Sequence, residues 1–121
     1  MTVNQALDAV DALQPNTFSR AEKLAWLSRV EALVKTQILD TCQAAPAISG
    51  YGPDTPGETE LLAAAPWDEL YLRYLQAQMD LANGEVARYE NSGALYNRLF
   101  AACRNHYNRT HVPKSTGWQF F

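Results

Sequence analysis

The chain has 121 residues, a formal net charge of −3 and 47% hydrophobic residues, which indicates a single domain large enough to bury a core. No apolar run approaches the roughly 18 residues of a membrane span. The first residues also lack the basic and apolar blocks of a secretory signal, so we expect a soluble, cytoplasmic product.

The first third of the chain predicts two helices. Residues 3–13 carry apolar side chains every three or four positions after Thr2, a good N-terminal cap, and "QPN" then ends the helix. The second predicted helix covers residues 20–43. Ser19 and Glu22 have the spacing of a capping box at its start. Its apolar stripe is wide enough for burial on more than one side and includes Leu24, Leu27, Val30, Val34 and Ile38.

Residues 46–60 predict a long connection. The segment "PAISGYGPDTPGETE" holds three prolines and three glycines, which interrupt both helices and strands. Connections of this length in compact domains are often functional or disordered.

A third helix is predicted over residues 67–90. Pro66 suits the start of a helix, and the apolar spacing continues past Gly84 to Tyr89. We therefore expect Gly84 to lie inside the helix, at a cost of about 1 kcal/mol relative to alanine. The joint is expected in the following "ENS", where Asn91 or Ser92 would cap a new helix.

The last predicted helix covers residues 93–109 and is followed by a tail, residues 112–121, that ends in "GWQFF". No stretch longer than four residues alternates cleanly with the period of a strand. The sequence thus predicts an all-α bundle of about four helices in one domain, residues 1–121, with a long loop after the second helix and an extended C-terminal tail.

Charge is distributed unevenly along the chain. Residues 54–90 hold eight acidic side chains and two arginines, whereas residues 91–121 hold four basic side chains and no acidic one. Two interpretations are open: pairing between neighbouring helices of one chain, or head-to-tail contact between copies. The aromatic tail would either cover its own bundle or dock on another subunit. The candidate interface residues are Glu85, Glu90, Arg98, Arg104, Arg109, Trp118, Phe120 and Phe121.

The sequence offers little sign of catalysis. It holds no phosphate-binding glycine loop, nucleophile elbow or paired-cysteine metal motif. Cys103 and His106 lie three residues apart, and His111 or Cys42 would have to converge with them to form a metal site. The favoured interpretation is a buried thiol beside a partly exposed imidazole, so we expect neither an enzyme nor a cofactor. A small metal-dependent enzyme remains the third hypothesis.

DNA contact is the second hypothesis. Arg98, Arg104 and Arg109 accompany aromatic residues, a mixture found in nucleic-acid-binding proteins. The sequence pI near 5.3 and the small number of basic residues give a weak electrostatic footprint for a dedicated binder.

Three segments carry a resemblance to a known family: "PNTFSRAEKLAWLSRVE" (15–31), "LLAAAPWDELYLRYLQAQMDLANGEVARYENSGALYN" (61–97) and "YNRTHVP" (107–113). They resemble small prophage-encoded proteins from the head-morphogenesis region of tailed phages. The pattern opens with proline-aromatic-aspartate-x-leucine-tyrosine, from Pro66 to Tyr71, and continues through the asparagine-glycine-glutamate at 83–85 to Tyr96 and Asn97. The chain departs from it at Trp67, where the family often has tyrosine or phenylalanine, and in the loop 46–60.

The resemblance implies a structural role as a head–tail connector, or adaptor. Such proteins are small helical bundles that form rings under the portal through which DNA passes. It also implies portal and tail-completion proteins as partners, a homo-oligomer on assembly and non-specific contact with DNA. The expected location is the cytoplasm of the bacterial host, or the virion once assembled. The competing interpretation within a prophage is a small DNA-contacting or regulatory protein without catalytic activity.

Overall fold

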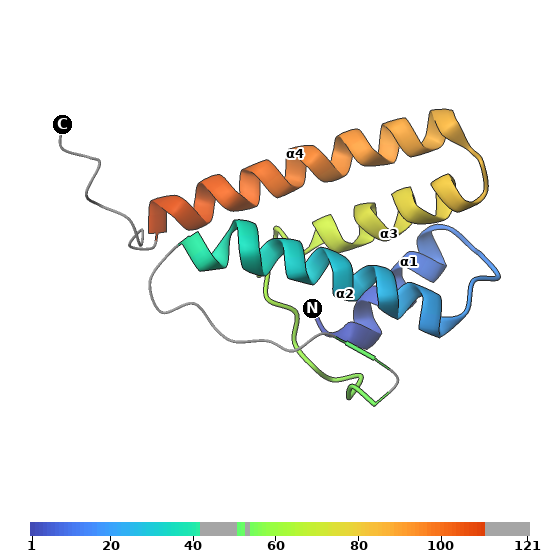
Figure 1. Cartoon of the computed structure of the whole chain (residues 1–121), viewed down its shortest axis with the longest axis horizontal. Coiled ribbons are helices and arrows are strands. Elements are labelled where there is room, and N and C mark those ends of the chain that lie inside the picture. The colour runs from blue at the N-terminus through green and yellow to red at the C-terminus, as the bar shows by residue number, and fades with distance from the viewer. Residues whose placement is uncertain (42–50, 53, 111–121) are drawn as a thin grey trace.

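The computed structural model describes residues 1–41, 51–52 and 54–110 (Figure 1). Within those residues the regular structure consists of helices, namely α1 (Val3–Leu13), α2 (Arg20–Gln37), the short 3₁₀ helix η1 (Leu39–Thr41), α3 (Glu69–Ala82) and α4 (Val86–Thr110). The prediction of an all-α bundle is confirmed for this part of the chain. None of its helices is both long and apolar enough to cross a membrane. The predicted tail, residues 112–121, lies outside the described residues.

Helix α3 is the centre of the bundle and contacts α1, α2 and α4 (Figure 1). Its side chains are buried on several sides, and Leu70, Tyr71 and Leu75 are fully buried. Helix α4 runs antiparallel to α3 along one side of the molecule, and α3 is its main neighbour. Burying these apolar side chains is the main force that holds the four helices together.

The starts of the first two helices agree with the sequence. The Thr2 hydroxyl accepts the Gln5 backbone N–H, and the Gln5 side chain accepts the Thr2 N–H in return. Ser19 and Glu22 make the same reciprocal pair at the start of α2, so the predicted capping box is confirmed. Such pairs satisfy backbone donors that a helix start leaves without a partner.

Two predicted boundaries were wrong by a few residues. Helix α2 ends at Gln37 rather than extending toward residue 43, because the chain tightens into the 3₁₀ helix η1 after the C-cap residue Ile38. Helix α3 begins at Glu69 rather than at residue 67. The preceding residues form tight turns, in which the Trp67 N–H bonds the Ala64 carbonyl and the Leu70 N–H bonds the Trp67 carbonyl.

The joint between the last two helices was predicted in the wrong place. Helix α3 stops at Ala82, and Gly84 takes a left-handed conformation with φ 72° that residues other than glycine rarely adopt. The Gly84 N–H bonds the Leu81 carbonyl at 3.1 Å, and the Glu85 N–H bonds the Asp80 carbonyl at 2.9 Å. These two bonds form a Schellman motif, which satisfies the carbonyls at the end of α3.

The segment "ENS" therefore lies inside α4 and does not start a helix. Ser92 is buried, and its hydroxyl donates to the Asp80 carboxylate on α3 at 3.0 Å, so it joins the two helices instead of capping one. Gly93 lies in open surroundings, with no atom within 4 Å of where a Cβ would be. Helix α4 consequently continues through it to Thr110.

The described part of the long connection is held against the start of α1. The N–H groups of Val3 and Asn4 bond the carbonyls of Thr59 and Gly57, and the Leu61 N–H bonds the Met1 carbonyl. Gly57 permits this approach, because a Cβ there would lie 2.2 Å from the Asn4 side chain. Residues 57–61 are thus an ordered strap across the N-terminal end of the bundle.

Candidate functional site

The five charged interface candidates within the described residues are all exposed. Glu85 immediately precedes α4 and Glu90 lies in its first two turns, whereas Arg98, Arg104 and Arg109 lie in its second half. Glu90 and Arg109 are separated by about 28 Å along the helix at ~1.5 Å per residue. One end of α4 is therefore acidic and the other basic, an order that also suits the helix dipole. Trp118, Phe120 and Phe121 lie outside the described residues.

The two ends of α4 do not neutralise each other within the chain. Among the described residues, the side-chain ion pairs are Lys23–Asp11, Lys35–Asp40, Arg73–Glu69 and Arg88–Glu85, and none involves Arg98, Arg104 or Arg109. Over this part of the chain, pairing between neighbouring helices does not account for the uneven charge. The three arginines of the basic end of α4 make no ion pair among the described residues.

Helix α4 also leaves most of its surface uncovered. Its buried side chains are Ser92, Phe100 and Cys103, in a helix of 25 residues. Tyr96 packs edge-on against Tyr74 of α3, with ring centroids 5.1 Å apart, and continues to Phe100. A single aromatic row therefore fixes α4 to the bundle and leaves its opposite face to solvent.

A polar cavity of about 460 Å³ opens at the acidic end of α4. The described residues around it come from the end of α1, from α3 and from α4, and include Leu13, Gln14, Gln76, Asp80, Arg88 and Asn91. The large apolar side chains that the described surface exposes also belong to this end of the helices: Leu13, the last residue of α1, is 48% exposed, Leu81 is 53% exposed and Val86 is 62% exposed. The surface around the cavity thus combines acidic and apolar groups.

Asp80 lines this cavity and is 1% exposed. Its Oδ1 accepts the Gln14 side-chain amide at 2.9 Å, and its Oδ2 accepts the Ser92 hydroxyl at 3.0 Å. Both donors are neutral, and none of the ion pairs among the described residues involves Asp80. Each oxygen of this buried carboxylate therefore accepts one hydrogen bond, and a carboxylate oxygen can accept a second.

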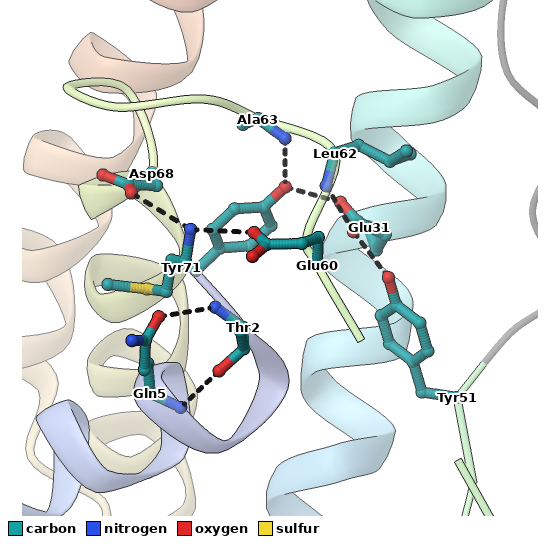
Figure 2. Close-up of polar contacts among 10 residues, drawn as sticks. Thr2, Gln5, Glu31, Tyr51, Glu60, Leu62, Ala63, Asp68 and Tyr71 are labelled. Atoms are coloured by element: carbon teal, nitrogen blue, oxygen red, sulfur yellow. Dashed lines mark hydrogen bonds and ion pairs between the residues drawn. The ribbon is translucent and has the colours of Figure 1, made fainter. Parts of the chain in front are cut away.

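A second buried carboxylate, Glu31, lies in the middle of α2 and is 1% exposed (Figure 2). Oε1 accepts the Tyr71 hydroxyl from α3, and Oε2 accepts both the Tyr51 hydroxyl at 2.7 Å and the Leu62 N–H at 2.9 Å. The Tyr71 oxygen in turn accepts the Ala63 N–H at 2.8 Å. These bonds tie the connection between α2 and α3 to both helices, and we call them the Glu31 cluster.

The Glu31 cluster keeps its tyrosines protonated. Burial, followed by the charge of Glu31 and its hydrogen bond, raises the pKa of Tyr71 far above its ordinary value. Burial and the hydrogen bond to Glu31 likewise raise the pKa of Tyr51. Tyrosines that stay protonated are weak acids and are not available as general bases, so the cluster acts through its hydrogen bonds, which join α2, α3 and the connection between them.

The sequence contained a signal for Glu31 that the prediction missed. Leu24, Leu27, Glu31, Val34 and Ile38 follow a three-four spacing, so a glutamate occupies a position of the buried stripe. A charged residue in such a position needs several donors around it. Those donors come from residues 51, 62 and 71, and pairing over such distances in the chain cannot be deduced from periodicity.

Cys103 and His106 lie near each other but differ in environment. Cys103 is buried, and that burial raises the pKa of its thiol, which disfavours the reactive thiolate. His106 is exposed and its ring lies 5.4 Å from that of Trp67. Both line an apolar pocket of about 170 Å³ between α2, α4 and residues 62–67. Among the described residues no three metal-ligating side chains converge, and Cys42 and His111 lie outside them.

Comparison with known protein families, with curated proteins and with solved structures finds no match. The candidate surface has two parts: the acidic and apolar end with the Asp80 cavity, and the basic end of α4.

Proposed function

We propose that the chain is a structural protein of phage assembly, a head–tail connector that forms a ring with portal or tail components and has no catalytic activity. The observation that carries the proposal is the distribution of charge along α4, which is acidic at its start and basic at its end. Among the described residues, no ion pair joins the two ends. The acidic and basic ends are both exposed, and the described ion pairs leave Arg98, Arg104 and Arg109 without a carboxylate partner. Opposite charges at two ends of one protein favour contact between copies.

The resemblance of residues 15–31, 61–97 and 107–113 to head-morphogenesis proteins supports the same role. The Glu31 cluster is also consistent with it. The surroundings of the cluster raise the pKa values of Tyr51 and Tyr71, so these tyrosines stay protonated and are not activated for catalysis. In this role the protein is made in the bacterial cytoplasm and becomes part of the virion, beside the portal and tail-completion proteins.

Deletion of the gene from an inducible phage genome tests the proposal. We expect DNA-filled heads and free tails that remain unjoined in electron micrographs, and infectious particles once the gene is supplied from a plasmid. Normal numbers of joined particles after the deletion would contradict the proposal. The matched control is the deletion strain with an empty plasmid, in which heads and tails should remain unjoined.

A DNA-contacting regulatory protein is the second candidate, and the exposed arginines favour it. Arg98 and Arg109 are eleven positions apart and lie on nearly the same side of α4, with Arg104 about 120° around the helix. This candidate predicts measurable affinity for duplex DNA that falls steeply with salt and is lost when the three arginines become glutamine. The connector proposal predicts weak, non-specific binding, whereas tight binding to a defined sequence would favour regulation.

A further inference from the structure

We propose that the Asp80 cavity is a receptor for an arginine side chain of a second copy of this chain, supplied by the basic end of α4. The inference rests on the proposed function for its biological setting, and it names the contact through which copies would join. In this contact between copies, the acceptor is the buried carboxylate of Asp80 and the donor is the guanidinium of Arg104 or Arg109.

The chemistry of the cavity favours a cation. Each oxygen of Asp80 accepts one hydrogen bond from a neutral group, Gln14 or Ser92, and each can accept another. The side chains of Gln76 and Asn91 line the same cavity; the Gln76 oxygen already accepts a hydrogen bond from Arg73 at 3.1 Å, and the Asn91 oxygen is a further acceptor. Glu85 and Glu90, at the start of α4, add negative potential to this end of the bundle. A planar guanidinium with five donors matches several oxygen acceptors better than an ammonium does.

The nearest arginine of the same chain does not fill this role. Arg88 lines the cavity, but it is 67% exposed at its side chain and its Nε lies 3.9 Å from Glu85, with no ion pair to Asp80. Arg109 is 21 positions further along the same rigid helix, about 32 Å away at ~1.5 Å per residue. That separation is several times the length of an arginine side chain. Arg104 and Arg109 can therefore reach an Asp80 cavity only in another copy.

The surface around the cavity is suited to such a contact. Leu81 and Val86 are exposed at this end, where a second copy would cover apolar area while its arginine enters the cavity. Because the receptor and the donor lie at opposite ends of α4, the contact joins two different surfaces. Such head-to-tail contacts close into rings or continue as open filaments, depending on the rotation between copies.

Two full-length variants with complementary defects test the contact. Asp80→Asn removes the charge of the receptor but keeps the basic end, and R104Q/R109Q removes the donor but keeps the cavity. Each variant alone should remain a single chain, while an equimolar mixture should form one-to-one pairs and nothing larger. Wild-type protein should form larger species with rising concentration, up to roughly millimolar, in a buffer of low ionic strength.

Analytical ultracentrifugation and native mass spectrometry measure these species. We expect the Asp80→Asn contact to be at least about tenfold weaker than the wild-type contact, since a hydrogen bond to a charged group is lost. Asp8→Asn, a change at an exposed acid of α1, is the matched control and should associate as wild type does. Association of Asp80→Asn at wild-type strength, or a wild-type protein that remains a single chain throughout, would overturn the inference.

A second variant covers the case in which Asp80→Asn fails to fold. Asn91 is exposed and lines the cavity, so Asn91→Lys places an ammonium of the same chain beside Asp80. This variant should stay folded and lose self-association, because the new ammonium would pair with Asp80, which Arg88 leaves without an ion pair. Undiminished association would contradict the inference. Failure of these tests leaves the deletion phenotype unaffected, so the failure of this contact and that of the connector proposal can be told apart.

Discussion

The two buried carboxylates of this chain, Glu31 and Asp80, show the same exposed fraction but differ in their partners. Glu31 accepts three hydrogen bonds, from two tyrosine hydroxyls and one backbone N–H, and these come from α3 and from the connection after α2. Asp80 accepts two, from a neutral amide and a neutral hydroxyl, and faces a polar cavity. The comparison indicates that Glu31 holds the fold together, whereas Asp80 accepts fewer hydrogen bonds and is the carboxylate that we propose as the receptor for a second copy.

The largest effect is expected for Glu31→Ala. The change leaves Tyr71, Tyr51 and Leu62 without their acceptor, and each buried donor without a partner costs about 1–3 kcal/mol. We therefore expect the free energy of unfolding to fall by about 3–5 kcal/mol in urea titrations. Glu58→Ala, at an exposed position, is the control and should change it by less than about 0.5 kcal/mol. Equal losses of unfolding free energy for Glu31→Ala and Glu58→Ala would show that the Glu31 cluster does not stabilise the fold.

Tyr71→Phe should have the next largest effect, a loss of about 2 kcal/mol. It removes one donor to Glu31 and leaves the Ala63 N–H without an acceptor, while the ring still fills its place in the core. Tyr89→Phe on α4 is the matched control, because Tyr89 lies partly exposed and outside the cluster. Urea titration of both variants measures the difference, and a loss for Tyr71→Phe as small as for its control would contradict this role.

Alkaline pH should weaken the fold through the same residue. Burial and Glu31 raise the pKa of Tyr71 in the folded protein, whereas an unfolded tyrosine ionises near pH 10. Stability from this group is complete below about pH 10 and declines as the pH rises further, by up to about 1.4 kcal/mol per pH unit. The decline should be less steep in Tyr71→Phe. Parallel curves for wild type and Tyr71→Phe above pH 10 would show that this tyrosine titrates normally.

The position of the joint between α3 and α4 predicts opposite effects for two glycines. Gly84→Ala should destabilise the protein by about 1 kcal/mol, because alanine disfavours the left-handed conformation at φ 72°. Gly93→Ala should stabilise it by up to about 1 kcal/mol, since residue 93 lies inside α4 in open surroundings. Thermal unfolding of the two variants distinguishes the signs. A joint at residues 91–93 would reverse them.

The smallest effect on stability is expected for Asp80→Asn, within about 1 kcal/mol of wild type. The asparagine oxygen can still accept from Gln14, its amide can donate to the Ser92 oxygen, and no charge is buried. A loss as large as that of Glu31→Ala in the same urea titration would place Asp80 among the residues that hold the fold. The distinction between the two carboxylates would then fail.

Local signals in the sequence were sufficient for part of this structure. Thr2 with Gln5 and Ser19 with Glu22 fix helix starts through bonds that span three residues, so spacing alone reveals them. Gly84 was misjudged because helical periodicity continues on both sides of it, and only the backbone angle distinguishes an interior glycine from a terminating one.

The candidate site was harder to predict for a physical reason. Glu85, Glu90, Arg98, Arg104 and Arg109 could be selected from charge alone, and they are exposed in the structure. Asp80 was not selected, because its burial depends on Gln14, 66 residues away in sequence, and on the path of α4. Buried polar groups depend on contacts between distant segments, which patterns of a single helix do not contain.

The contact between the Asp80 cavity and a second copy is tested most directly by the average solution mass of wild type and of Asp80→Asn. The mass is measured over a range of concentrations, with both proteins shown to be equally folded. We expect the average mass of wild type to rise above that of one chain as the concentration increases, while Asp80→Asn remains a single chain. A rise of equal size in both proteins, or no rise in wild type, would contradict it.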